Sequence, residues 1–232
     1  MIDVRTFASL GRFQIDWLNA RHHFSFGHYH EPSRMGWGAL RVWNDDEIQP
    51  KTGFPPHPHA DMEIITYVRD GAITHEDSLG NKGRTVAGDV QVMSAGSGIR
   101  HAEYNREDEL TRIFQIWIVP ETSGGTPRWD AMSFPKADRA GELVMLASGD
   151  PETDGGLMIR ADARVMGATL EAGQSVTYSP KAGRHQYLAT TKGVVAVNGE
   201  RVSARDGAAI TDVDKITLTA LEDAELVLTD TR

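Results

Sequence analysis

Short runs of β-branched and aromatic residues, separated by glycine, asparagine and proline, follow one another along the whole chain. The clearest runs lie at residues 38–44, 62–68, 89–93, 112–119, 164–170, 174–179, 194–199, 215–220 and 224–230. Such runs at spacings of roughly 8–20 residues are typical of a β-sandwich or β-barrel. No segment sustains the apolar periodicity of an amphipathic helix beyond about two turns. The pattern therefore predicts an all-β fold with few, short helices.

Two features divide this β pattern into halves. Residues 120–141 are polar and rich in glycine and proline, which places a domain boundary there. Glu63 and His185 begin similar runs, and each stands eight residues before a glycine, Gly71 and Gly193 respectively. This faint repeat fits two copies of one design, but chance would also produce it, because β-hairpins commonly share glycine turns.

Two short segments make sharper predictions. The run at 112–119 is apolar on both faces except for Gln115, so it is expected to be covered on both sides, as in a closed barrel or stacked sheets. Asn198 and Gly199 tolerate the positive φ values of a type I′ turn and predict a hairpin in the second half.

Composition excludes several classes of protein. The chain of 232 residues has 24 Lys and Arg against 33 Asp and Glu, a net charge of −9, which argues against a nucleic-acid-binding surface. Because it has no cysteine, disulfides, thiolate metal sites, iron–sulfur clusters and thiol nucleophiles are excluded. No apolar run approaches the ~20 residues of a membrane span, and the N-terminus does not have the pattern of a signal peptide. We expect a soluble, cytoplasmic protein that binds neither nucleic acid nor membranes.

Two histidine-containing pairs stand out in the first half. His57 and His59 flank a proline, and in extended backbone alternate side chains point to the same face. Forty-two residues after His59, His101 and Glu103 repeat this spacing. On neighbouring strands, three imidazole nitrogens and one carboxylate would converge, a set that suits a divalent transition metal and leaves two octahedral positions open. One pair alone would more often be two surface histidines, but the two pairs together predict a metal site.

The other candidate residues carry weaker signals. His22 and His23 are adjacent, so in a strand they face opposite ways and cannot both bind one ion. His75 and Asp77 resemble a His-x-Asp pair, but they precede a turn-forming segment and are expected to cap that turn, whereas the isolated His185 is expected to be structural. The chain has no Gly-x-Ser-x-Gly nucleophile elbow, no phosphate-binding loop and no His-Glu-x-x-His zinc motif.

Several longer segments resemble the pirin family of bicupins. They are HHFSFGHYHEP, MGWGALRVWNDD, GFPPHPHADMEIITYV, HEDSLGN and GDVQVMSAGSGIRHAEYN, and the resemblance is dense from residue 21 to 120. It implies two tandem cupin (jelly-roll-like) β-barrels. The N-terminal, metal-binding barrel would occupy residues 1–125, a linker 126–140, and a C-terminal barrel without a metal site 141–232.

The resemblance also implies a ligand set. Carried over by motif, the metal ligands are His57, His59, His101 and Glu103, the same four residues that the spacing selects. Glu63 stands where many cupins place a ligand carboxylate, so it is the alternative to Glu103.

A single metal ion per chain is expected. Aligning the two repeats places Ser179 and Lys181 opposite His57 and His59, and neither offers an imidazole to a metal in the second barrel. The resemblance favours Fe(II), with nickel, copper, manganese or zinc as alternatives, because ligand sets of this kind are not selective by themselves.

The activity that the resemblance implies is that of a metal-dependent dioxygenase. It would cleave a flavonol such as quercetin with O2 and release carbon monoxide and a depside. Glu103 would accept the proton of the 3-hydroxyl group, and Phe24, Phe26 and Trp37 would line an apolar pocket. The alternative is a redox- or metal-responsive regulatory protein that binds a protein partner without catalysis. A purely structural metal is the third interpretation, which the open coordination positions disfavour.

Overall fold

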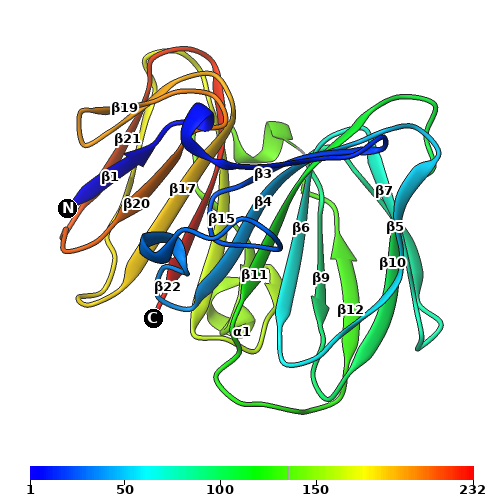
Figure 1. Ribbon diagram of the computed structural model, residues 1–232. Helices are drawn as coiled ribbons and strands as arrows, with labels where there is room; N and C mark the ends of the chain where they lie inside the picture. The colour runs from blue at the N-terminus through cyan, green and yellow to red at the C-terminus, as the bar shows by residue number, and fades with distance from the viewer. Residues whose placement is uncertain (135) are drawn as a thin grey trace.

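The computed structural model describes residues 1–134 and 136–232 and is nearly all β (Figure 1). Each half of the chain forms a seven-stranded and a four-stranded sheet. The described helices are η1 (Phe7–Ser9), η2 (Pro32–Arg34), η3 (Lys136–Arg139) and α1 (Pro151–Asp154). The predicted all-β fold with few, short helices is confirmed. Among the described residues, no helix has the length and apolar character that a membrane crossing requires.

The N-terminal half forms a barrel from two antiparallel sheets. Its seven-stranded sheet has the order β12 (Arg128–Met132), β9 (Val90–Ser94), β6 (Glu63–Asp70), β11 (Thr111–Ile118), β4 (Leu40–Ile48), β3 (Leu18–His22) and β2 (Gly11–Gln14). Its four-stranded sheet has the order β5 (Thr52–His59), β10 (Ile99–Asn105), β7 (Ala72–Asp77) and β8 (Lys82–Val86). The candidate metal ligands lie on the four-stranded sheet and point toward the seven-stranded one.

The C-terminal half repeats this arrangement. Its seven-stranded sheet has the order β1 (Ile2–Arg5), β20 (Gly207–Ile210), β17 (His185–Lys192), β22 (Ala224–Thr231), β15 (Ala163–Leu170), β13 (Val144–Ser148) and β14 (Leu157–Met158). Its four-stranded sheet has the order β16 (Ser175–Tyr178), β21 (Ile216–Ala220), β18 (Val195–Val197) and β19 (Glu200–Val202). The predicted hairpin at Asn198 and Gly199 joins β18 to β19, and both residues have positive φ.

Two strands do not pair as the ranges expected for the two barrels and the linker imply. β1 begins the chain but pairs with β20 of the C-terminal sheet, with Ile2 opposite Ile210, and Figure 1 shows it on that side of the molecule. β12 falls in the segment expected to be a linker but pairs with β9, with Arg128 opposite Ser94. Both are edge strands, and the open edge of a sheet can pair with any strand within reach, whatever its composition. The predicted ranges need correction for these two strands.

The two seven-stranded sheets pack against each other around a shared apolar core. The ring of Trp43 lies 5.4 Å from those of both Phe114 and Tyr187, which come from different halves of the chain. Phe114 and Ile116 of β11 point into this core, whereas Gln115 points into the N-terminal barrel. The prediction that residues 112–119 are covered on both sides is confirmed for 113–118, whereas Val119, beyond the end of β11, is exposed.

His23 is fully buried where the two halves meet. Its Nδ1 atom lies 2.8 Å from the hydroxyl group of Tyr187. Burial, together with the positive charges of Arg5 and Arg34, holds the pKa of His23 well below its usual value. When the chain unfolds, that pKa returns to about 6.5, so below this pH the unfolded state takes up a proton that the folded state excludes.

We therefore expect the folded state to lose stability as the pH falls. For His23 alone, the free energy of unfolding should drop by roughly 1 kcal/mol between about pH 7.5 and about pH 5.5. Urea unfolding at the two pH values measures the loss. His23→Gln keeps a polar side chain that cannot titrate in this range, and its loss should be smaller by that amount. An equal loss in both proteins would contradict the prediction.

Candidate metal centre and its pocket

The two histidine motifs lie on neighbouring antiparallel strands, β5 and β10. Their register places His101 directly opposite His57, and His59 lies two residues along β5 on the same face. A bulge after His101 shifts the register, so that Glu103 pairs with Phe54. The extra residue lies on β5, so His101 and Glu103 of β10 still point to the same face. The strand pairing thus explains how residues 42 positions apart in the sequence come together.

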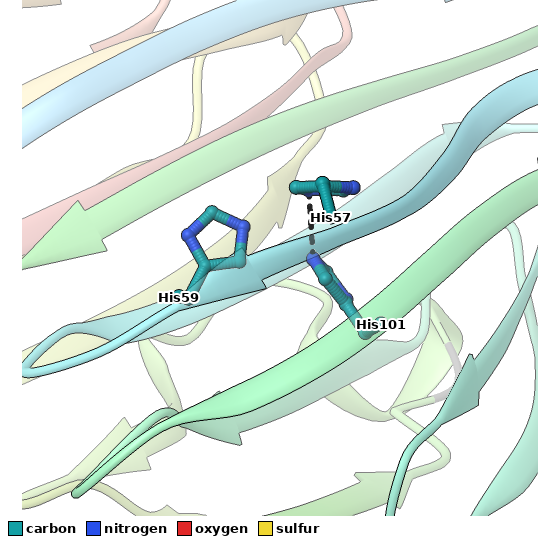
Figure 2. A group of neighbouring side chains, drawn as sticks. All are labelled: His57, His59 and His101. Carbon is teal, nitrogen blue, oxygen red and sulfur yellow. Dashed lines mark hydrogen bonds between the residues drawn. The ribbon is translucent and has the colours of Figure 1, made fainter.

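The three imidazole rings of these motifs meet above the strand pair, and we call them the histidine triad. Figure 2 shows His57 and His59 on one strand and His101 on its neighbour. Their ligand atoms lie within 4.8 Å of one another, and the ring centroids are 4.5–4.9 Å apart. The Nε2 atoms of His57 and His101 are 3.1 Å apart.

The hydrogen bonds around the histidine triad leave Nε2 atoms available as ligands. Nδ1 of His57 lies 2.8 Å from the carbonyl oxygen of Pro55, so it carries the proton and leaves the lone pair on Nε2. Nε2 of His59 is buried without a hydrogen-bond partner in the described part of the chain. A cation among the three rings would satisfy these nitrogens at once. The donor set therefore fits a divalent transition metal.

Burial keeps two of these rings in the form that binds metal. It is the largest cause that lowers the pKa of His59 to about 4 and that of His101 to about 3, and neighbouring histidines lower both further. Neutral imidazole is the ligand form, so both lone pairs are available at pH 7.

Glu103 lies beside the histidine triad, under a polar row that crosses the seven-stranded sheet. On successive strands the row consists of His22, Asn44, Gln115, Thr66 and Gln91. The carboxylate of Glu103 accepts hydrogen bonds from Thr66 Oγ1 at 3.0 Å, Gln91 Nε2 at 2.6 Å and Gln115 Nε2 at 3.0 Å. Its ligand atom groups with those of His75 and His101. The structure thus holds a buried carboxylate, both oxygens of which accept hydrogen bonds, next to one edge of the triad.

The role of His75 was missed at the level of sequence. Its Nδ1 lies 3.4 Å from Nδ1 of His101, and its Nε2 lies 3.0 Å from a carboxylate oxygen of Asp77. The ring is fully buried and stacks on Trp129 with an interplanar angle of 8°. The expected cap of the following turn comes from Asp77, which accepts hydrogen bonds from the backbone N–H groups of Leu79 and Asn81. The His-x-Asp spacing on one strand, in register with Glu103, was the available signal.

This contact predicts an effect of His75 on metal affinity. If Asp77 accepts the proton on Nε2 of His75, Nδ1 of His75 can accept from Nδ1 of His101 and direct Nε2 of His101 toward the metal. We expect His75→Phe, which preserves stacking on Trp129, to weaken metal binding by about 10–100-fold. Competition with a chromophoric chelator measures this change, and wild-type affinity in the variant would refute the assigned role.

Glu63 takes no part in the histidine triad. It is buried, and its carboxylate accepts a hydrogen bond of 2.6 Å from the hydroxyl group of Ser94. Burial raises the pKa of Glu63, while Ser94 and the nearby Arg160 oppose that shift. Among the described residues, Glu63 belongs to no group of side chains able to hold a metal.

A pocket of about 570 Å³ opens beside the histidine triad. His57 and His59 form part of its wall, and most of the remaining lining is apolar or aromatic, including Phe54, Phe26 and Trp117. The ring of Trp117 packs edge-on against His59 at 4.9 Å. A concave, largely apolar pocket with a few polar groups is typical of small-molecule sites.

The structure corrects part of the expected pocket lining. Phe26 lines the pocket as predicted. Phe24 instead packs on Tyr187 in the core between the two halves, and Trp37 packs on His185. Both predictions were wrong because local sequence does not indicate which face of the barrel a loop residue covers.

The second barrel carries the residues aligned with His57 and His59 at its surface. Ser179 and Lys181 are exposed. His185 is half-buried and contacts Trp37 at a ring distance of 5.4 Å. In the residues that the structure describes, both groups of side chains able to hold a metal lie in the first barrel.

Comparison with known proteins covers both halves of the chain. Residues 3–118 match the pirin family model, and residues 145–231 match the model of the quercetinase C-terminal cupin domain. A pirin-like protein from Caulobacter vibrioides is 66% identical over 99% of both chains. Quercetin 2,3-dioxygenase from Escherichia coli is 42% identical over 99% of this chain and 98% of the enzyme. The bacterial pirin YhhW from Escherichia coli, crystallised with nickel(II), aligns with a TM-score of 0.94 at 40% identity over 100% of this chain and 99% of YhhW.

Proposed function

This chain belongs to the pirin family, and from that membership we propose that it is a metal-dependent dioxygenase that cleaves a flavonol such as quercetin. The observation that carries the proposal is the opening of a largely apolar pocket of about 570 Å³ onto His57 and His59. A flat aromatic substrate fits such a lining, and a relative of 42% identity is named quercetin 2,3-dioxygenase.

In this proposal one Fe(II) ion is held by Nε2 of His57, His59 and His101, with Glu103 as the fourth ligand. Burial and the row of donors around Glu103 support this set, because they hold the side chains in place before an ion arrives. When bound, the ion supplies Lewis acidity and a centre at which substrate and O2 are oriented. The nickel(II) complex of YhhW supports the binding of a metal ion by this chain without selecting iron.

The side chains of the pocket divide the remaining tasks. Phe26, Phe54 and Trp117 provide apolar surfaces that bind the rings of a flavonol and exclude water. Glu103, which accepts a hydrogen bond from the pocket-lining Gln115, would accept the proton of the 3-hydroxyl group. One O2 is consumed for each flavonol, and the products are one carbon monoxide and one depside.

The test is oxygen uptake after anaerobic reconstitution with Fe(II). Wild-type protein should consume O2 and quercetin in equal amounts, and both His57→Ala and Glu103→Ala should lower the rate by at least about 100-fold. His185→Ala, a histidine change in the second barrel, is the matched control and should retain wild-type uptake. Circular dichroism and metal content establish that each variant is folded and show what it has bound.

Two outcomes would contradict the proposal. No uptake by wild-type protein that holds one tightly bound metal ion would refute the dioxygenase activity and favour a regulatory protein. Two metal ions per chain by elemental analysis would refute a single site in the first barrel.

A further inference from the structure

Asp46 is a buried carboxyl group that lines the pocket and that neither the histidine triad nor Glu103 uses. The residue is only 2% exposed, yet it forms part of the cavity wall. Its Oδ1 atom is buried and has no hydrogen-bond partner within the described residues. A buried polar group left unpaired destabilises a fold, so a group of this kind in a pocket suggests that a ligand completes it.

The neighbouring carboxyl group shows what a structural aspartate looks like in this fold. Asp45 points to the opposite face of β4 and is paired with Arg69 and with Arg205, whose Nε lies 2.7 Å away. Across the sheet from Asp46 stand Ala20 and Ile113, which offer no side-chain donor. The fold therefore neutralises one of two adjacent carboxyl groups and leaves the other facing the pocket.

The strand register gives the distance between Asp46 and the metal end of the pocket. Gln115, which donates to Glu103, and Trp117, which contacts His59, lie two and four residues along β11 from Ile113, the partner of Asp46. At a rise of about 3.3 Å per residue, these separations are about 7 and 13 Å along the strand. A ligand anchored at the histidine triad would therefore reach Asp46 with an outer ring and not with its metal-facing groups.

The surroundings of Asp46 select the kind of group it would bind. Burial raises the pKa of Asp46 well above its usual value, and the charges of Asp45 and Glu103 raise it further. A neutral carboxyl group both donates and accepts hydrogen bonds, which matches a hydroxyl group and does not match a cation. The nearby His22 and Asn44 bond each other, with Nδ1 of His22 2.8 Å from Oδ1 of Asn44, and neither bonds Asp46 within the described residues.

We propose that Asp46 is a specificity-determining residue that hydrogen-bonds a phenolic hydroxyl group on the ring of the substrate farthest from the metal. This inference rests on the proposed function, because it assumes that the aromatic substrate is anchored at the histidine triad. It assigns the pocket to polyhydroxylated flavonols in preference to flavonols whose outer rings carry no hydroxyl groups.

The experiment compares two ligands that share the metal-facing groups. Quercetin carries hydroxyl groups on its outer rings, whereas 3-hydroxyflavone keeps only the 3-hydroxyl and 4-carbonyl groups. Affinities are measured anaerobically by fluorescence quenching on metal-loaded protein, so no turnover is needed. Wild-type protein should bind quercetin at least about 10-fold more tightly, because a site built to bond a hydroxyl group rejects an analogue without it.

Two variants test whether the carboxyl group of Asp46 causes this preference. Asp46→Leu, of similar size, should reduce the affinity ratio to about one, chiefly by weakening quercetin, whereas Asp46→Asn should keep part of the preference. Asp130→Leu, at an exposed position away from the pocket, is the control and should keep the wild-type ratio.

The outcomes separate this inference from the proposed function. Equal binding of the two ligands by wild-type protein overturns the inference even if a variant fails to fold, as does an unchanged ratio in Asp46→Leu. Failure of both ligands to bind overturns it together with the flavonol assignment. Selective binding that depends on Asp46, without oxygen uptake, supports the subsite and refutes only the dioxygenase activity.

Discussion

Metal-loaded protein is expected to lose its ion when His101 is replaced by alanine. His101 lies at the centre of the site: its ring centroid is 4.5 Å from that of His57 and 4.9 Å from that of His59. Its removal deletes one of three convergent nitrogens and leaves His75 and Glu103 without the ring that connects them to the others. We expect the affinity for the metal to fall by more than about 100-fold, which exceeds the effect expected for His75→Phe, because His75 contacts a ligand and not the metal.

Elemental analysis after dialysis against a chelator measures this loss. Wild-type protein should retain one ion per chain, and His101→Ala should retain almost none. His185→Ala is the matched control, because it removes a partly buried histidine from the second barrel, and it should keep wild-type metal content. Retention of one tightly bound ion by His101→Ala would show that the metal sits elsewhere.

Replacement of Asp45 by alanine is expected to be the most destabilising of the single changes considered. Its carboxylate is fully buried and pairs with Arg69, also buried, and with Arg205 from the C-terminal half of the chain. Arg69 lies in addition against the ring of Phe114, 4.8 Å from its centroid. Without Asp45, the guanidinium of Arg69 stays buried and loses its counter-charge. Breaking a buried ion pair in this way destabilises a protein by about 3–5 kcal/mol.

Urea unfolding of wild-type and variant protein tests this expectation. Asp130→Ala removes an aspartate whose side chain is 54% exposed and whose surface ion pair with Arg128 contributes no more than about 1 kcal/mol. The free energy of unfolding should therefore change little in Asp130→Ala and strongly in Asp45→Ala. A loss below about 1 kcal/mol in Asp45→Ala would show that water reaches Arg69 and replaces the pair.

The histidine triad shows which features of a site a short-range sequence pattern can predict and which depend on strand pairing. His57 and His59 share a face because a strand has a period of two, and this holds wherever the strand lies. That His101 stands opposite His57 depends on strand pairing, which the matching motif only suggested. Glu103 shares the face of His101 because of the same period of two, but its hydrogen bonds with Thr66, Gln91 and Gln115 depend on the packing of the two sheets, which the spacing does not indicate.

The errors share one physical cause. Phe24 and Trp37 were expected in the pocket and lie against Tyr187 and His185 of the other half. The strand at Ile2–Arg5 was expected in the first barrel and pairs with the second. Each outcome depends on which sheet edge or face is within reach once both halves have folded, and composition at one position does not encode that.

Strand periodicity, turn residues and alternate histidines act over a few residues, so the class of the fold and the candidate metal ligands could be predicted from them. Only the folded structure shows that His75 and Asp77 lie behind His101, that Asp45 pairs with residues from both halves, and that Asp46 lines the pocket with its Oδ1 atom unpaired within the described residues. These relationships join residues from different strands or faces, and packing is what establishes the distances and the burial on which their energies depend.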